Sequence, residues 1–419
     1  MNDICRTMND ICRTMNDIAI YTLTSELHDE KAVGDVTKEF LGSLGIEYVF
    51  KGSDYGDYGS HALDVIYVRT GGTEGIFKRL LPQLQAKSDE PFYLLTSGKS
   101  NSLAASLEIL SYLRLNGLQG EIVHGQADKV ANKLRILAAS GEAKRQLRGC
   151  KLGIIGAPSD WLIASYADKE IVKEKTGIEL IEIPMKEVLE SLPPAPSKRG
   201  GACDKCHNVA AVSEKVREAL PGAYQIYEAL KTVVEKHGLQ GLTIRCFDLL
   251  TAVHNTGCMA LAKLNAEGIV AGCEGDVPAL LSMMISKVVT GVSGFQANPA
   301  RIDTETGELL FAHCTIPLNM VERYELDTHF ESGIGVGIRG YMTPGPITIF
   351  KVSGDLSRSF IAEGELLRCE AKTDLCRTQM VIRLNNPAQA SYFLTNPIGN
   401  HHIIVPGHQL EVLEIIINN

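Results

Sequence analysis

A chain of 419 residues is too long for one hydrophobic core of ordinary size, so we expect two or three domains. Hydrophobic residues make up 45% and charged residues 22%, and no apolar run reaches transmembrane length, which favours a soluble globular protein without a membrane span. The formal net charge is -9 and no Lys- or Arg-rich run stands out, so nucleic acid and anionic membranes are poor candidate partners.

The chain begins with a repeat, because MNDICRT at 1–7 returns at 8–14 and MNDI starts again at Met15. We treat residues 1–16 as an N-terminal extension with no bearing on the fold. From residue 17 onward, apolar runs alternate with helix-like stretches. The runs that predict strands are 18–23, 47–50, 64–69 and 92–96. This alternation predicts a parallel sheet with helical crossovers, so we assign residues 17–150 to an N-terminal α/β domain.

A second series of strands and helices starts after the basic, polar stretch 144–148, which places a domain boundary near residue 150. Its predicted strands are 152–156, 241–247 and 268–273, and its predicted helices are 212–236 and 279–289. These segments define a central α/β domain at 151–294.

The helical period fades beyond about residue 295. Short apolar runs at 309–312, 347–352 and 358–362 are separated by Gly, Pro and Asp turns, and a helical element follows at 387–394. The predicted fold class is therefore α/β, with two doubly wound parallel-sheet domains followed by a mostly antiparallel β domain at 295–419.

The eleven cysteines are scattered singly, and the N-terminus lacks a basic segment followed by an apolar core. This pattern indicates reduced thiols in a cytoplasmic protein. Cys203-Asp-Lys-Cys-His207 matches the haem-attachment string, but that chemistry belongs to exported proteins. A redox role or a zinc site is weaker than a pair of packed thiols, because two further zinc ligands are missing. The glycines at 153–156 and the SGKS string at 97–100 lack the remaining glycine spacing of dinucleotide and phosphate loops.

Acidic residues follow two of the expected strands in the central domain. Asp248 comes at the end of one, and Glu274 and Asp276 follow the next. Loops at the carboxyl ends of parallel strands share one rim of the sheet, where ligands bind. Near the chain end, His401 and His402 follow a Gly-Asn pair. Any one acid alone is more often a solvated loop residue, but two carboxylates with an imidazole suit a hard divalent cation.

Several short motifs together resemble the L-fucose/L-arabinose isomerase family, and in particular its shorter fucose-isomerase-like members. In chain order they are Tyr93-Leu-Leu-Thr-Ser-Gly98, Gly241-Leu-Thr-Ile-Arg-Cys-Phe-Asp248, Gly272-Cys-Glu-Gly-Asp276, Phe295-Gln-Ala-Asn-Pro299, Ala312-His-Cys-Thr-Ile-Pro317 and Gly399-Asn-His-His402. The resemblance extends over residues 18–419 and implies a metal-dependent aldose–ketose isomerase, an intramolecular oxidoreductase of carbohydrate metabolism.

The resemblance also implies the site residues. A manganese ion, or another divalent cation such as Mg²⁺ or Co²⁺, would be held by Asp248, Asp276 and His402, with Asp248, Asp276 and Glu274 as the catalytic acids. The residues expected to bind the sugar are His313, Asn298, Arg245 and His401. The family implies a homo-oligomer, a trimer or a hexamer, in which the first-domain loops 70–74 and 97–101 complete the active site of a neighbouring subunit.

Interconversion of an aldose and a ketose moves a proton between adjacent carbon atoms. A divalent ion bound to the carbonyl and the adjacent hydroxyl stabilises a cis-enediol intermediate, and a carboxylate takes the proton and returns it. We therefore expect an isomerase that acts on a free sugar. Two alternatives stay open: a relative that acts on a sulfonated or phosphorylated sugar, and a non-catalytic sugar-binding protein of the same fold.

Overall fold

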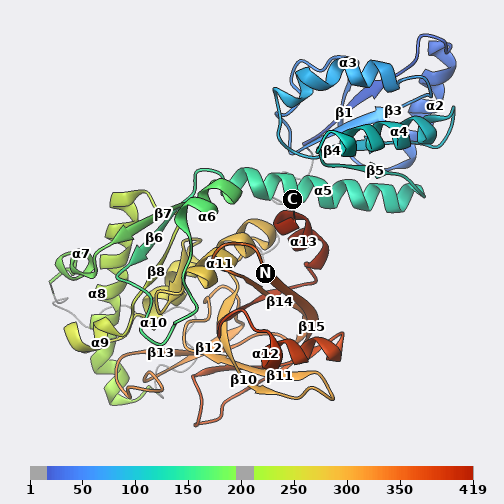
Figure 1. The fold of residues 1–419 in the computed structure, drawn as a ribbon. Helices are drawn as coiled ribbons and strands as arrows, with labels where there is room; N and C mark the ends of the chain where they lie inside the picture. The colour runs from blue at the N-terminus through green and yellow to red at the C-terminus, as the bar shows by residue number, and fades with distance from the viewer. Residues whose placement is uncertain (1–16, 195–211, 419) are drawn as a thin grey trace. The chain divides into compact units, whose positions relative to one another are not determined.

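The computed structural model describes residues 17–194 and 212–418. The N-terminal repeat at 1–16 and the Cys-x-x-Cys-His motif at 203–207 therefore lie outside the described residues. The chain divides into two compact units (Figure 1). The first contains the residues up to Arg145 and the chain end from Glu414, and the second is Gln146–Leu413.

The first unit is built on a parallel sheet with the strand order β2-β1-β3-β4-β5. Its strands are β1 (Ile18–Leu23), β2 (Val49–Gly52), β3 (Leu63–Val68), β4 (Phe92–Leu95) and β5 (Gly120–Val123). Its helices are α2 (Glu30–Ser43), α3 (Glu74–Gln85), α4 (Ser102–Leu115) and α5 (Ala127–Leu147). Every residue of β1 is buried, because helices cover both faces of the sheet.

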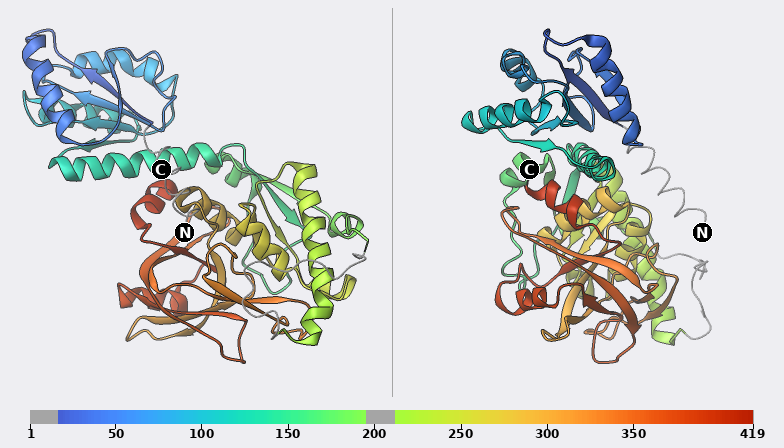
Figure 2. Two further views of the ribbon diagram at one scale, coloured as in Figure 1. Left: turned by 180° about the vertical axis from the view of Figure 1, so that it is seen from behind. Right: turned by 90° about the vertical axis from the view of Figure 1, so that its right-hand side faces the viewer.

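Two apolar clusters attach the helices to this sheet. On one face, Leu41 of α2 and Leu134 of α5 pack against the strands. On the other face, Phe77 of α3 and Ile109 of α4 do the same. Helices on both sides of the sheet can be followed in Figure 2. This layered arrangement is the one that alternating strands and helices predict.

The second unit starts with another parallel sheet, in the order β7-β6-β8-β9. Its strands are β6 (Lys151–Ile155), β7 (Glu179–Ile183), β8 (Gly241–Ile244) and β9 (Val270–Cys273). The helices of this part are α6 (Lys169–Thr176), α7 (Met185–Glu190), α8 (Glu214–His237), α9 (Asp248–Ala252), α10 (Cys258–Ala266) and α11 (Val277–Thr290).

The second unit also contains a closed antiparallel barrel with the order β10-β11-β16-β15-β14-β17. Its strands are β10 (Phe295–Ile302), β11 (Glu308–His313), β14 (Gly345–Val352), β15 (Ser359–Glu370), β16 (Thr378–Leu384) and β17 (His402–Pro406). Strands β12 (Arg323–Asp327) and β13 (Gly337–Tyr341) form a separate two-stranded sheet, and the short helices η2 (Pro387–Ser391) and α12 (Tyr392–Thr395) follow β16. The last helix, α13 (Leu410–Asn418), begins in the second unit and continues into the first from Glu414. The predicted fold class is confirmed, whereas the domain limits at 150 and 294 stay predictions.

Helix α11 joins the parallel sheet to the barrel. It packs against β9 on one side and against β14 and β17 on the other. Its buried residues run without a break from Val277 to Ser286, as expected for a helix that is enclosed on all sides. Asp276 is the N-cap of this helix, and its carboxylate accepts a hydrogen bond from the backbone N–H of Ala279 at 2.8 Å. The N-terminus of α11 therefore lies where sheet and barrel meet.

One expected element differs near the candidate site. The strand predicted at 241–247 ends at Ile244, and Asp248 begins α9 instead of ending a strand. The backbone N–H of Asp248 donates to the carbonyl of Arg245 at 3.1 Å, so the chain turns into a helix before the predicted strand is complete. Within residues 17–194 and 212–418, no helix has the length and the apolar character needed to cross a membrane.

Helix α5 packs closely against the backbone at Ala62, and a glycine substitution tests this contact in the first unit. A Cβ atom at Gly141 would overlap the carbonyl oxygen of Ala62, whereas the same atom at Gly42 in α2 would meet open space. We predict that Gly141→Ala lowers the free energy of unfolding by about 1–3 kcal/mol. Gly42→Ala should raise it by about 0.5–1 kcal/mol. Urea denaturation followed by circular dichroism measures both, and a Gly141→Ala variant as stable as wild type would contradict this packing.

Candidate metal centre

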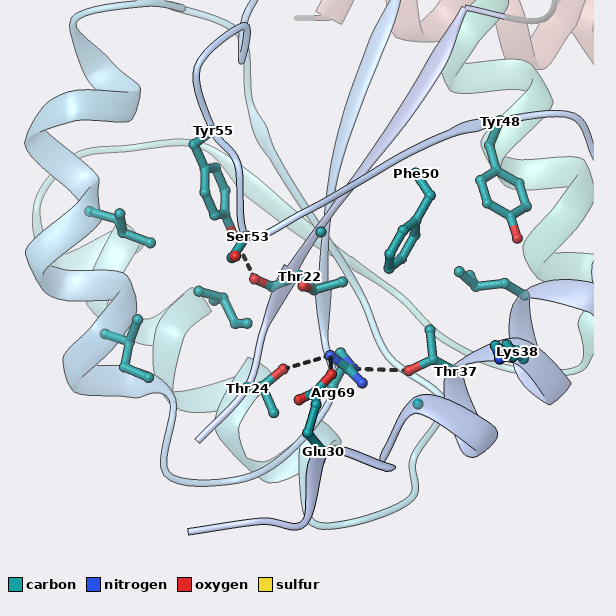
Figure 3. Close-up of a pocket in the computed structure, with 16 residues that line it drawn as sticks. Thr22, Thr24, Glu30, Thr37, Lys38, Tyr48, Phe50, Ser53, Tyr55 and Arg69 are labelled. Atoms are coloured by element: carbon teal, nitrogen blue, oxygen red, sulfur yellow. Dashed lines mark hydrogen bonds and ion pairs between the residues drawn. The ribbon is translucent and has the colours of Figure 1, made fainter. Parts of the chain in front are cut away.

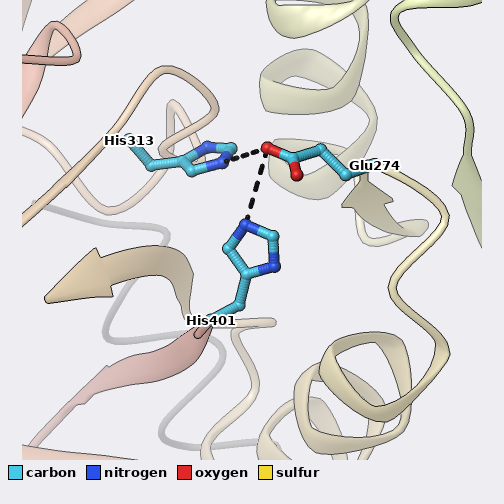
Figure 4. A group of neighbouring side chains, drawn as sticks. All are labelled: Glu274, His313 and His401. Carbon is cyan, nitrogen blue, oxygen red and sulfur yellow. Dashed lines mark ion pairs between the residues drawn. The ribbon is translucent and has the colours of Figure 1, made fainter. Parts of the chain in front are cut away.

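Three side chains from distant parts of the second unit converge on one point (Figure 4). Glu274 follows β9, His313 ends β11, and His401 directly precedes β17. Each offers one ligand atom, and these atoms lie within 4.8 Å of one another. It is the one group of this kind found among residues 17–194 and 212–418. The arrangement can hold a metal ion.

The backbone at Glu274 is strained. Glu274 has a φ of 63° and Gly275 a φ of 72°. A left-handed conformation costs a residue with a side chain about 1–3 kcal/mol, and such strain clusters at functional sites. A Cβ atom at Gly275 would overlap the carbonyl oxygen of Ala157, so glycine is required there. The turn brings the Glu274 carboxylate toward the two imidazoles, and the indole N–H of Trp161 donates to its Oε2 at 2.7 Å.

Hydrogen bonds at Nδ1 orient both imidazoles. His401 Nδ1 lies 2.8 Å from Asp276 Oδ2, and His313 Nδ1 lies 3.0 Å from Thr315 Oγ1. Both Nε2 atoms face Glu274 Oε1, each at 3.6 Å. Metal-binding histidines characteristically use one ring nitrogen for a carboxylate or another oxygen and leave the other nitrogen for the metal.

The distances around Glu274 fit a shared ion better than a hydrogen bond. A separation of 3.6 Å is too long for an N–H···O bond. Ligand bonds of about 2.0–2.2 Å place two ligand atoms roughly 2.8–3.6 Å apart. Among the described residues, the buried Nε2 of His401 has no hydrogen-bond partner. A buried polar atom without a partner is unfavourable, and a bound cation would satisfy it.

Asp276 contacts this centre through His401. It is fully buried, and its Oδ1 caps α11 while its Oδ2 bonds to His401. The Lys351 ammonium, which is also buried, lies 3.4 Å from Oδ1 and 3.5 Å from Oδ2. Both oxygens are therefore occupied by protein groups, which suits a residue that orients His401.

Ion pairing sets the protonation of the cluster. Burial lowers the pKa of His401, but Asp276 and Glu274 outweigh burial and raise that pKa to about 9. Burial raises the pKa of Glu274, but His313 and His401 hold it below its usual value. Burial likewise raises the pKa of Asp276, and Lys351 and His401 bring it down to about 2. At pH 7 the metal-free cluster thus holds two carboxylates and a protonated His401, and a divalent ion would replace that proton.

Two residues of the ligand set predicted from sequence lie in other contacts. Asp248 has a side chain that is 42% exposed and accepts a hydrogen bond from Arg245 Nε at 3.1 Å. His402 is buried with Nε2 3.0 Å from the hydroxyl of Tyr392 and Nδ1 3.2 Å from the Asn400 carbonyl. The set Asp248, Asp276 and His402 stays a prediction, and the structure gathers different residues into the metal-binding group.

The residues expected to bind the sugar fall into two classes. His313 and His401 belong to the metal-binding group. Asn298 lies on β10, paired with Ala312, and the structure describes no partner for its buried Oδ1. Arg245 donates from Nη1 to the Pro158 carbonyl at 3.0 Å and from Nη2 to Asp160 at 2.8 Å.

Sequence reasoning did not identify Trp161, Lys351 and Gln296 as parts of this region. Gln296 accepts a hydrogen bond from the backbone N–H of Cys273 at 2.8 Å and so fixes the end of β9. Two signals were present in the sequence: Trp161 is the only tryptophan of the chain, and Lys351 is the one charged residue of a mostly apolar strand. A lysine in such a run predicts a buried ion pair.

No protein-family model matches the chain. It is similar to proteins named sulfoquinovose isomerase. The one from Clostridium sp. (strain MSTE9) is 27% identical over 196 residues, which cover 45% of this chain and 43% of that protein. The one from Priestia aryabhattai is 23% identical over 281 residues, 64% of this chain and 63% of that protein. The one from Alkalicoccus urumqiensis is 20% identical over 278 residues, with the same coverage. The chain thus spans less than two thirds of each of these relatives.

Adjacent histidines give a direct test of the ligand set. We predict that His401→Gln weakens Mn²⁺ binding at least ~10-fold, whereas His402→Gln leaves the affinity within about 2-fold of wild type. Because the single tryptophan donates to Glu274, its fluorescence should be quenched as paramagnetic Mn²⁺ binds. Titration of metal-free protein measures the affinity, and circular dichroism checks the fold of both variants. A large loss with His402→Gln and none with His401→Gln would restore the set predicted from sequence.

Proposed function

We propose that this chain is a metal-dependent aldose–ketose isomerase that acts on a sulfonated sugar. The observation that carries the proposal is the group Glu274, His313 and His401, in which the His401 Nε2, without a hydrogen-bond partner among the described residues, faces a carboxylate. The similarity to proteins named sulfoquinovose isomerase supports isomerisation and favours the sulfonated substrate over a neutral sugar.

The donor set fits a divalent cation, for which we propose Mn²⁺, with Mg²⁺ or Co²⁺ as substitutes. When bound, such an ion polarises the carbonyl of the sugar and stabilises negative charge beside it. Glu274, His313 and His401 would hold the ion, and Asp276 would keep His401 oriented. Asn298 Oδ1, which lacks a partner among the described residues, would accept a hydrogen bond from a sugar hydroxyl.

The proton has to move between C1 and C2, and this step needs an accessible acid–base group. Asp276 is enclosed, whereas Asp248 is partly exposed and held by Arg245. Phe247, next to Asp248, packs edge-on against Trp161, with 4.7 Å between the ring centroids. Trp161 in turn donates a hydrogen bond to Glu274. This chain of contacts supports Asp248 as the group that takes the proton from one carbon of a cis-enediol and returns it to the other.

Two other functions make different predictions for turnover. An isomerase of neutral or phosphorylated sugars would keep the same centre but prefer those substrates. A non-catalytic sugar-binding protein would bind metal and sugar without exchange of the C–H proton. A cytoplasmic location stays a prediction from the sequence.

Isomerisation in deuterated water tests the proposed reaction. With sulfoquinovose and Mn²⁺, we expect interconversion with the ketose and deuterium at C2 of the aldose or C1 of the ketose. Asp248→Asn should lower kcat about 100-fold or more, because it keeps the shape and removes the base. Asp160→Asn is the matched control, since Asp160 binds the same Arg245 but is 84% exposed, and it should change kcat less than about 10-fold.

Turnover without label would count against proton transfer through an enediol while leaving isomerisation in place. Absence of turnover on sulfonated, phosphorylated and neutral sugars would favour the binding protein. Equal rates for Asp248→Asn and wild type would remove Asp248 from the reaction and make Glu274 the next candidate base.

We also propose a homo-oligomer, a trimer or a hexamer. The loop after β6 exposes large apolar side chains, with Trp161 51%, Tyr166 77% and Ile163 92% exposed, and such patches mark interaction surfaces. Light scattering should give a mass three or six times the 45.6 kDa of the chain. Ile163→Asp should shift the protein toward smaller species, whereas Lys186→Asp, on a helix outside this loop, should not. A wild-type monomer at micromolar concentration would exclude the proposal.

A further inference from the structure

Asp327, at the end of β12, is shared by two arginines of the second unit. Its Oδ2 lies 3.2 Å from Arg339 Nη2, on the neighbouring strand β13, and 3.4 Å from Arg377 Nε, just before β16. The side chains of Arg339 and Arg377 are only 14% and 12% exposed. Glu325, the register partner of Arg339, is paired with Arg323 at 2.9 Å and does not add to this group. Because a guanidinium stays charged in proteins, the two arginines and Asp327 together carry one surplus positive charge.

Both arginines keep donors that the protein does not use. Within the described residues, the buried Nε of Arg339 has no hydrogen-bond partner. Arg377 donates from Nε to the Thr328 carbonyl at 2.7 Å and from Nη2 to Thr328 Oγ1 at 3.3 Å, and no partner is found for its Nη1 in the described part of the chain. A buried donor without a partner is unfavourable, and an oxyanion is the acceptor that fits guanidinium groups best. The arginine pair is therefore suited to an anionic group of a ligand.

Arg69 of the first unit shows a different charge balance. It lines a cavity there, and its Nη1 donates to Glu30 Oε1 at 2.9 Å (Figure 3). One carboxylate thus offsets one guanidinium in that ion pair. Asp327, in contrast, offsets only half of the charge of Arg339 and Arg377.

Strand pairing places Arg377 beside the candidate metal centre. The next residue, Thr378, is the register partner of His313 on β11. Paired residues of antiparallel strands have Cα atoms about 4.5–5.5 Å apart, and consecutive Cα atoms are about 3.8 Å apart. The Cα atoms of Arg377 and His313 are therefore within roughly 9–10 Å of each other.

Arg339 is connected to the same end of the barrel. The backbone N–H of Ile338, the residue before it, donates to the carbonyl of Cys314 at 3.2 Å. Cys314 directly follows His313. Both arginines are thus one residue away from a backbone that is paired with His313 or its neighbour.

A row of ring contacts leads from the arginine pair to Glu274. His329, which follows the Thr328 that Arg377 bonds to, has its ring centroid 5.7 Å from that of Phe247. Phe247 lies 4.7 Å from Trp161, again between ring centroids, and Trp161 donates to Glu274. The arginine pair and the metal-binding group therefore belong to one continuous set of contacts.

We infer that Arg339 and Arg377 bind the sulfonate group of the sugar, while the metal-binding group acts at the other end of the molecule, at C1 and C2. This inference rests on the proposed function. A sulfonate carries a single negative charge, which matches the single surplus charge of the two arginines and Asp327. A phosphate ester carries about -1.5 to -2 at pH 7 and would be matched less well. Asp327 therefore acts as a positioning residue that holds both guanidinium groups and sets the charge of the site.

Calorimetric titration of the full-length protein in the presence of Mn²⁺ tests this site. The probes are sulfoquinovose, 6-deoxyglucose, which is the same sugar without the sulfonate, and glucose 6-phosphate. We expect sulfoquinovose to bind at least ten-fold more tightly than 6-deoxyglucose and more tightly than glucose 6-phosphate. Arg339→Met and Arg377→Met should each weaken binding of sulfoquinovose at least ten-fold and leave binding of 6-deoxyglucose within about two-fold of wild type.

Arg383→Met is the matched control. Arg383 lies on β16, near the end farther from Arg377, is 55% exposed and is paired with Glu308, so its loss should change neither affinity. Circular dichroism checks the fold of every variant. If a Met variant does not fold, Arg339→Lys and Arg377→Lys keep the charge but lose the planar fork, and each should weaken binding of sulfoquinovose at least three-fold.

Equal affinity of the wild type for sulfoquinovose and 6-deoxyglucose would overturn the inference. So would tighter binding of glucose 6-phosphate, an unchanged affinity for sulfoquinovose in the folded variants, or an equal loss of both sugars, which would indicate a purely structural role. Binding of sulfoquinovose that depends on both arginines supports the inference whether or not the sugar is turned over. Failure of the proposed reaction is thereby distinguished from failure of this site.

Discussion

The hydrogen bond between Asp276 and His401 organises the second unit around its candidate centre. At 2.8 Å it joins the first turn of α11 to the residue that precedes β17, and both partners are fully buried. In such surroundings a satisfied charged pair is strong and directional, while an unpaired one is costly. The bond fixes which nitrogen of His401 remains free. Since α11 packs on both the parallel sheet and the barrel, the same bond also ties the two layers together.

Charge balance explains why this arrangement is suited to a cation. The pKa values of Asp276 and Glu274 are held low, which favours both carboxylates in the ionised form, and the buried Lys351 ammonium on β14 offsets the charge of Asp276. The remaining negative charge faces His313 and His401. Without a metal, the second charge is met by a proton on His401, whose pKa lies near 9. A divalent ion at the same place would contact three ligand atoms at once, which a proton cannot do.

Much of the fold was predictable because the length and spacing of apolar runs indicate which residues of a strand or helix are buried. The run at 18–23 coincides with β1, and the helix expected at 279–289 lies within α11. Closure of the C-terminal strands into a barrel was not predictable, since it depends on pairings such as β10 with β17 between residues about one hundred positions apart.

The candidate site was predicted in part. The acidic residues after two strands and the histidine pair identified the region of the site. They did not show which residue of the adjacent pair His401 and His402 belongs to the metal-binding group. Successive residues of an extended segment point to opposite sides, so whether His401 or His402 serves the centre depends on the pairing of His402 with Ala297. The left-handed backbone of Glu274 is likewise invisible in the sequence, although it turns that carboxylate toward the imidazoles.

The central claim is that Glu274, His313 and His401 hold a divalent ion. Anomalous diffraction from crystals grown with Mn²⁺, recorded on both sides of the manganese absorption edge, tests it most directly. We expect one strong peak in the second unit, within about 2.0–2.4 Å of Glu274 Oε1 and of the Nε2 atoms of His313 and His401. A peak between Asp248 and His402, or no peak in this region, would contradict it.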